Sequence, residues 1–161
     1  MKRTIIFLIL GIIILIIGYN LLESFTSWAV PDQLHGEWIG NLKVAVRFNN
    51  NGKFTFVTAP DTVNLNLIVK ENGDVSGIFG AAAFESCSIC KNRGWISKRL
   101  NLGTDYIISG NLTGAIFPTD TIVTKRISFP FNMENHIISG SMFQKQGMGV
   151  FPMADIRIIK K

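Results

Sequence analysis

The sequence predicts an all-β domain in which an antiparallel meander of about eight strands closes into a small β-barrel, preceded by one N-terminal transmembrane helix. Three observations lead to this fold class. Apolar and polar residues alternate with a period of two along most of the chain. Turn residues such as Asn-Gly separate the alternating segments. A single long apolar run stands apart from them at the N-terminus.

The apolar run from Ile5 to Leu22 has the length of a membrane span. At 1.5 Å per residue it makes about 27 Å of helix, close to the roughly 30 Å hydrocarbon core of a bilayer. Lys2 and Arg3 precede the run, and Glu23 is the first charge after it. Basic residues stay on the cytoplasmic side, so we expect a retained signal anchor with a cytoplasmic N-terminus and a periplasmic or extracellular domain. A signal peptide cleaved near Ser27-Trp28-Ala29 is the alternative.

The rest of the chain has the size of one domain. We expect an anchor over residues 1–23, a linker over residues 24–33 and an exported barrel domain over residues 34–161. The formal net charge of the chain is +5. This charge is modest for a domain of this length, so nucleic acid is not an expected partner.

Strands are predicted from alternation and from the turns between them. The segment from Val44 to Phe48 runs into Asn49-Asn50-Asn51-Gly52, and the segment from Val63 to Val69 runs into the turn at residues 71–74 and a return strand from Val75 to Ile78. Further strands are expected at Trp95–Leu100, Asp105–Leu112, Thr121–Phe129, Asn135–Gln144 and Val150–Lys160. A meander of this length removes its edges by closing or by forming a sandwich.

Glycines inside the strands favour closure into a barrel. Gly77, Gly110 and Gly140 interrupt otherwise regular strand patterns. Interior glycine permits the coiling and the bulges that a small barrel needs. The alternative is that these glycines face a closely packed neighbour.

The first strand opens with Gly36-Glu37-Trp38. A Gly-x-Trp at the start of a meander resembles the lipocalin-like, or calycin, barrels. The resemblance implies that Trp38 closes one end of the barrel and that an Arg from the last strand packs near it. Arg157, in Ile156-Arg157-Ile158, is the residue placed to take that role.

Cys87-Ser88-Ile89-Cys90 contains the two cysteines of the chain. In an exported domain we expect the pair to form a structural disulfide. A thiol redox role is an alternative, although the flanking residues do not resemble the start of a helix after a buried strand. A zinc site would need two more ligands, for which His35 and His136 are available, and no metal is expected.

A basic cluster follows the cysteines. It consists of Lys91, Arg93, Lys98 and Arg99, and no acidic residue lies between Ser86 and Thr104. Such a cluster can contact anionic headgroups or an acidic partner. The alternative is an ordinary solvated face.

No catalytic pattern is present in the sequence. Neither histidine stands near a nucleophile elbow, and no phosphate-binding glycine loop is found. We therefore expect a protein that is not an enzyme and uses no cofactor: a membrane-anchored interaction module, acting as an accessory subunit or scaffold of a larger membrane complex. Binding of a small apolar ligand inside the barrel, in the manner of lipocalins, is the first alternative, and a thiol redox protein using Cys87 and Cys90 is the second.

Overall fold

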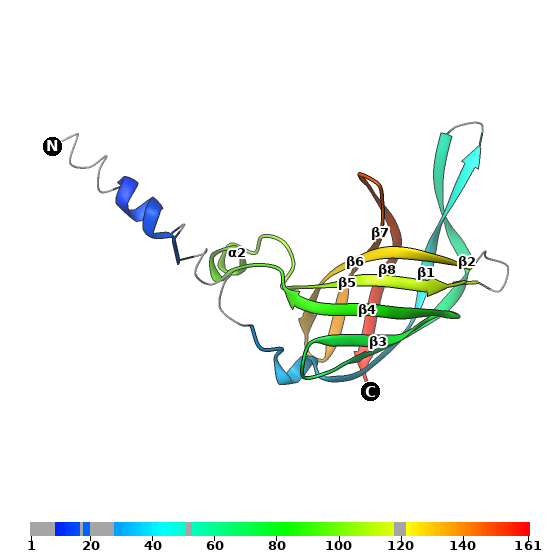
Figure 1. The fold of residues 1–161 in the computed structure, drawn as a ribbon, viewed down its shortest axis with the longest axis horizontal. Helices are drawn as coiled ribbons and strands as arrows, with labels where there is room; N and C mark the ends of the chain where they lie inside the picture. Colours follow the sequence, from blue (N-terminus) through cyan, green and yellow to red (C-terminus); the bar gives the residue numbers. More distant parts are fainter. Residues whose placement is uncertain (1–8, 17, 20–27, 51–52, 118–121) are drawn as a thin grey trace.

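The computed structural model describes residues 9–16, 18–19, 28–50, 53–117 and 122–161. Eight antiparallel strands follow one another around a closed barrel in chain order, with the last strand paired to the first (Figure 1). The predicted all-β meander and its closure into an eight-stranded barrel are confirmed. The strands are β1 (Gly36–Asn50), β2 (Lys53–Val69), β3 (Asp74–Phe79), β4 (Ala82–Lys91), β5 (Tyr106–Gly114), β6 (Val123–Glu134), β7 (Ile137–Gln146) and β8 (Gly149–Lys160).

Alternation decides which side chains fill the barrel. In β2, Val63, Leu65, Leu67 and Val69 are buried while Thr62, Asn64 and Ile68 are exposed. The turn to β3 is built as its sequence predicts: the Asn72 Oδ1 accepts from the Asp74 N–H at 3.0 Å, and Gly73 adopts a φ of +88°. The largest fully buried side chains of the described core include Trp38, Phe79, Phe129 and Phe131.

The first two strands are longer than the sequence predicts. The return from the Asn-rich turn and the segment from Val63 to Val69 form the single strand β2, paired with β1 from Gly36↔Val69 to Asn50↔Lys53. The register shifts once, between Lys43 and Ala45. β3 pairs with β2 only from Leu65 to Val69. The outer part of the β1–β2 hairpin therefore extends beyond its neighbours, as Figure 1 shows.

The sequence did not predict β4, because its inward residues change phase. Ala82 and Phe84 are buried, and after them Cys87 and Ile89. Ser86 has a φ of +50°, and the pairing of β4 with both neighbours shifts at this point, which marks a β-bulge. One extra residue moves every later side chain to the other parity, so no single alternation spans the strand.

The predicted strand from Trp95 to Leu100 is wrong. Residues Trp95–Arg99 form the short helix α2, and the Lys98 N–H donates to the Gly94 carbonyl at 3.0 Å. β4 pairs directly with β5, down to Lys91↔Tyr106. The chain between them is a connection with no strand to pair with, so it forms a local helix instead.

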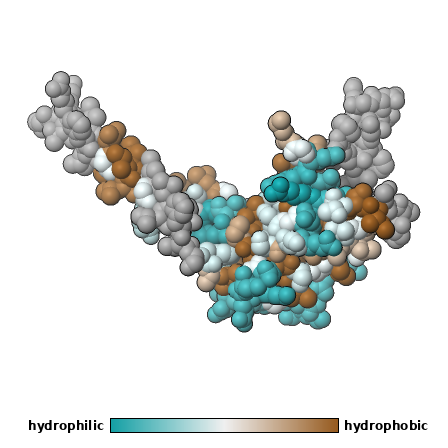
Figure 2. All heavy atoms as spheres, in the orientation of Figure 1, coloured by the Kyte–Doolittle hydropathy of each residue, from teal (hydrophilic) through white to brown (hydrophobic). Residues whose placement is uncertain are grey.

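The N-terminal region is described only in part. Residues 9–16 and 18–19 are helical, and the rest of the predicted span from Ile5 to Leu22 lies outside the described residues. Within the described part of the chain, no helix is both long enough and apolar enough to cross a membrane. Figure 2 shows the apolar side chains of residues 9–16 exposed away from the barrel.

All three interior glycines lie where neighbouring strands approach closely. A Cβ on Gly77 would lie 2.0 Å from the Asn66 carbonyl oxygen. A Cβ on Gly110 would lie 2.3 Å from the Cys87 Sγ and 2.6 Å from the Cys87 Cα. A Cβ on Gly140 would lie 2.2 Å from the Pro130 carbonyl oxygen. The glycines thus allow neighbouring strands to pack closely enough for the barrel to close. Barrel closure and a closely packed neighbour, the two explanations that the sequence left open, therefore both apply.

We expect Gly110→Ala to destabilise the barrel by about 1–3 kcal/mol, the usual cost of overpacking. The conflict is partly with backbone atoms, so a side chain cannot simply turn away. Thermal unfolding of the full chain in detergent should show a melting temperature lower by roughly 3–10 °C. Ser109→Ala, one residue earlier on the same strand, is the control and should change little. An unchanged melting temperature for Gly110→Ala would contradict the close approach of β4 and β5.

Candidate functional site

One end of the barrel is sealed by the chain that leads into β1. Because the strands alternate in direction, this end also carries the β2–β3, β4–β5 and β6–β7 connections and the C-terminus. The short helix η1 (Asp32–Leu34) lies across it, with Val30, Leu34 and Trp38 buried. The Trp38 Nε1–H donates to the Leu34 carbonyl at 2.9 Å. We call this region the closed end.

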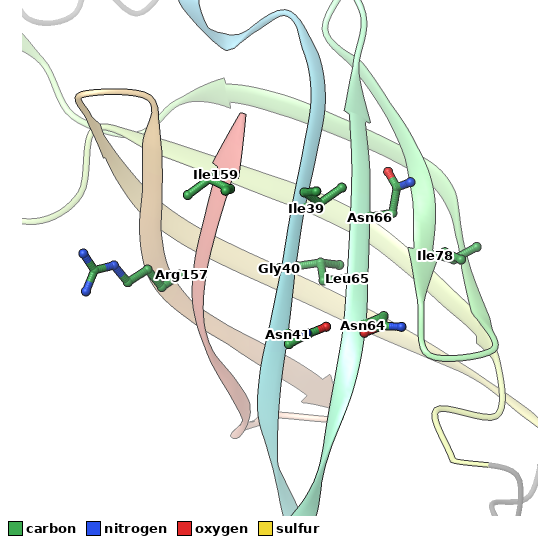
Figure 3. Close-up of a pocket in the computed structure, with 9 residues that line it drawn as sticks. All are labelled: Ile39, Gly40, Asn41, Asn64, Leu65, Asn66, Ile78, Arg157 and Ile159. Carbon is green, nitrogen blue, oxygen red and sulfur yellow. The ribbon is translucent and has the colours of Figure 1, made fainter. Parts of the chain in front are cut away.

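The cation that covers Trp38 is Lys160, which corrects the expectation for Arg157. The Lys160 Nζ lies 5.7 Å from the centre of the Trp38 ring and donates to the Gln33 carbonyl at 3.0 Å. Ile156 and Ile158 are buried, so alternation turns Arg157 to the outside of the barrel. Figure 3 shows the Arg157 side chain directed away from the wall.

A polar tie holds the two chain ends of the domain together. The Lys161 ammonium lies 3.1 Å from the Glu37 carboxylate, and the Asn66 Nδ2 donates to the other carboxylate oxygen at 2.9 Å. These two hydrogen bonds hold the pKa of Glu37 below its ordinary value. At neutral pH the ionised Glu37 carboxylate therefore stabilises these contacts. The stabilisation is lost as the pH falls through the lowered pKa and the carboxylate becomes protonated.

The expected disulfide is absent, and both cysteines are free. Cys87 is buried in the barrel and Cys90 is exposed on the outside. Three residues of extended strand separate their Cα atoms by about 10 Å, and an odd spacing directs their side chains to opposite faces. A disulfide needs Cα atoms within about 7 Å.

The free thiols also lack the environment of a redox site. Burial raises the pKa of both Cys87 and Cys90. Reactive cysteines need the opposite shift, toward the thiolate.

The two histidines do not form a metal site. His35 lies before β1, with its Nδ1 3.8 Å from Asp32, and His136 lies in the β6–β7 turn with a φ of +61°. No group of three or more His, Cys, Asp or Glu side chains is arranged as metal ligands among the residues that the structure describes.

The basic cluster divides into one structural residue, Arg93, and three exposed residues. Lys91 is exposed at the end of β4. The Arg93 Nε donates to Asp105 at 2.8 Å, with both side chains largely buried, and its Nη1 donates to the Leu102 and Gly103 carbonyls. Arg93 therefore holds the β4–β5 loop and is not available to a partner. Lys98 and Arg99 are exposed on α2.

The outer wall carries a groove that sequence reasoning missed. Its volume is about 600 Å³, and it crosses β8, β1, β2 and β3 (Figure 3). Leu65 lies at its floor, buried in the wall. The other lining residues are Ile39, Gly40, Asn41, Asn64, Asn66, Ile78, Arg157 and Ile159.

Cross-strand register arranges the apolar side chains of the groove in a row. Ile159 pairs with Ile39, Ile39 pairs with Asn66, and Asn66 pairs with Ile78. Ile137 extends the row on the other side by pairing with Ile159. Ile159 is 54% exposed and Ile78 is 49% exposed. We call Ile137, Ile159, Ile39 and Ile78 the isoleucine row.

The signal for this row was present in the sequence as broken alternation. Ile158-Ile159 and Ile137-Ile138 place apolar residues at consecutive positions, so one of each pair must face outward. Which outward residues become neighbours depends on the register between paired strands, including β8 with β1 where the barrel closes. The residue pattern of a single strand does not contain that information.

No family model matches the chain, and no curated protein and no solved structure shows a significant similarity to it.

We expect a maleimide to modify one thiol of the folded full chain, at Cys90, and the second only after denaturation. Burial protects Cys87, and the raised pKa of Cys90 should make its reaction slower than that of a free cysteine at pH 7.5. Mass spectrometry of the labelled protein measures this. Cys90→Ser should remove the fast reaction. Absence of any reactive thiol until a reductant is added would contradict the free cysteines.

Lys160→Ala should destabilise the barrel by about 1–2 kcal/mol, the sum of a cation–π contact and a hydrogen bond. Arg157→Ala, three residues away on the outside of the same strand, should change stability by less than about 0.5 kcal/mol. Urea unfolding of both variants measures the difference. Equal effects, or a larger effect at Arg157, would contradict the assignment of the closing cation to Lys160.

Proposed function

We propose that this protein is a membrane-anchored, exported β-barrel that acts as an interaction module, either as an accessory subunit or as a scaffold of a membrane complex. The isoleucine row over the outer groove is the observation that carries the proposal. In a water-soluble barrel, every second residue of a strand faces outward, and these outward residues are normally polar. Here Ile137, Ile159 and Ile39 pair on three adjacent strands, and Ile78 follows on the far side of Asn66. Three of these isoleucines, Ile39, Ile78 and Ile159, line a concave surface.

The groove has the composition of a protein interface. Its lining combines apolar residues with polar ones: Ile39, Leu65, Ile78 and Ile159 with Asn41, Asn64, Asn66 and Arg157. Contiguous exposed apolar surface on a folded domain marks an interaction site. Asparagine amides and an arginine guanidinium beside it supply directional hydrogen bonds. A partner segment that buries apolar side chains on the isoleucine row and offers an acceptor to Arg157 fits this surface.

The N-terminal segment supports membrane attachment. The described residues 9–16 expose isoleucine and leucine side chains on all sides of a helix, which is the pattern of a helix that is buried in lipid or protein. They lie within the apolar run from Ile5 to Leu22, which follows Lys2 and Arg3. We propose a retained anchor with the N-terminus in the cytoplasm and the barrel on the exported side.

The closed end supports a relationship to calycin barrels. Gly36-Glu37-Trp38 opens the first strand, the barrel is closed by eight antiparallel strands, and Trp38 packs under a helical turn at one end. Lys160 replaces the expected arginine as the cation over the Trp38 ring. We propose that the fold is calycin-like and that the working surface is its outer wall.

Ile159→Asp should separate the protein from its partner without unfolding it. A carboxylate in the row would have to be buried against apolar partner atoms, so we expect at least a tenfold loss of binding. The measurement is size-exclusion chromatography of the full chain after mild detergent extraction of membranes from its native cells. Wild type should elute within a larger complex, and Ile159→Asp should elute alone with an unchanged melting temperature.

Val150→Asp is the matched control. Val150 lies on the same strand, is exposed to a similar degree at 58%, and stands at the opposite end of the barrel. This variant should remain in the complex. A wild-type protein that is a monomer under every extraction condition, or equal loss in both variants, would contradict the interaction surface. Release of the wild type by alkaline carbonate would contradict the anchor.

A further inference from the structure

We infer that the loop between β4 and β5 is a second membrane contact: Lys98 and Arg99 bind anionic lipid headgroups while Leu100 and Leu102 enter the interfacial layer. This inference rests on the proposed anchor for its geometry. It adds a surface that the interaction proposal does not contain, at the closed end instead of the side wall.

The loop lies beside the point where the N-terminal chain reaches the barrel. Trp28, the first described residue of the linker, has its ring centre 5.9 Å from that of Tyr106 at the start of β5. Asn92 donates its N–H to the Asp105 carbonyl at 2.9 Å, which closes the base of the loop. Figure 1 shows α2 on the side of the barrel from which the N-terminal segment departs.

The linker is too short to move the closed end far from the membrane. Six residue steps separate Leu22, the last residue of the apolar run, from Trp28. Even a fully extended chain spans at most about 3.5 Å per step, so Trp28 stays within roughly 20 Å of the end of the span. A loop at the closed end is therefore within reach of the headgroup layer.

The loop is held in a fixed shape by internal polar contacts. The Arg93–Asp105 ion pair and the Arg93 bonds to the Leu102 and Gly103 carbonyls fix its second half. The Asn92 Nδ2 donates to the Thr104 Oγ1 at 2.7 Å, and the Asp105 N–H donates to the Asn132 Oδ1 at 2.8 Å. These bonds present the tip as a preorganised surface, so binding orders little additional chain.

Two leucines are exposed at this tip. Leu100 is 63% exposed and Leu102 is 59% exposed, in a loop whose polar groups are otherwise well paired. Lys98 and Arg99 precede them directly and form no ion pair with a described residue. Basic and large apolar side chains together are the composition of surfaces that lie in the membrane interface.

Lipid is favoured over an acidic protein by the position of the leucines. A purely electrostatic protein contact needs only the two cations, whereas the adjoining leucines gain free energy by leaving water. An anionic leaflet provides both environments next to each other, because its charge lies at the headgroups and its apolar chains lie directly beneath them. The long side chains of Lys98 and Arg99 can reach the headgroups while Leu100 and Leu102 lie deeper.

The test places a fluorescent probe at the tip of the loop in the full chain. Leu102→Cys, in a Cys90→Ser background, is labelled with an NBD maleimide, which keeps an apolar group at the position. The protein is reconstituted in vesicles of phosphatidylcholine alone or with one part in three of phosphatidylglycerol. We expect a blue shift and increased NBD emission only with phosphatidylglycerol, because two basic residues together favour the contact about thirty-fold.

Charge reversal separates this contact from general electrostatics. Lys98→Glu with Arg99→Glu should abolish the response to phosphatidylglycerol. Arg126→Glu with Lys145→Glu reverses an exposed basic pair on β6 and β7, directly opposite each other near the other end of the barrel, and should preserve it. An NBD spectrum that does not depend on phosphatidylglycerol, or the same loss with both charge reversals, would overturn the inference.

The anchor is tested separately in the same vesicles. Flotation of the protein with pure phosphatidylcholine vesicles reports the N-terminal anchor, because this lipid carries no net charge. If flotation fails but the NBD response to phosphatidylglycerol persists, the anchor is wrong and the loop contact stands. If flotation succeeds and the NBD response is absent, the anchor stands and the loop contact is wrong.

Discussion

Closure of the barrel depends on the seam between the first and last strands. Trp38 lies at this seam, buried under η1, with its ring covered by the Lys160 ammonium and its indole N–H bonded to the Leu34 carbonyl. β1 and β8 pair at Trp38↔Lys160, Ile39↔Ile159 and Val44↔Ala154. Gly40 allows this approach, since a Cβ there would lie 2.7 Å from the Ile158 Cγ2. Trp38 thus contributes both to covering the closed end and to the pairing of β1 with β8.

The seam also creates the proposed interaction surface. Ile39 and Ile159 are 120 positions apart in sequence and become neighbours only when β8 pairs with β1. The isoleucine row therefore exists in the closed barrel and not in an open sheet. A partner bound there would contact both sides of the seam. Its binding energy would add to the stability of the closed state, as for any ligand that binds only the folded form.

The sequence predicts the class of the fold better than it predicts the site. Alternation and turn residues predict most of the meander, and the interior glycines favour closure, because these are local signals. β4 was not predicted, because the bulge at Ser86 shifts its alternation by one residue. Arg157 was chosen by resemblance, whereas the two-residue alternation of β8 favours Lys160. The predicted disulfide is wrong because of the same two-residue alternation. Once Cys87 and Cys90 lie on one strand, their spacing directs the two side chains to opposite faces.

The positions of the two proposed surfaces constrain what the groove can bind. Ile39 lies three residues from the start of β1, so at about 3.3 Å per residue the isoleucine row lies roughly 10 Å from the closed end. Under the proposed attachment, that end faces the bilayer and the β4–β5 loop limits its tilt. A partner in the groove then approaches from the side, close to the membrane surface. This geometry favours the juxtamembrane segment of another membrane protein over a freely diffusing one, because confinement to the same membrane raises the effective concentration of the two surfaces.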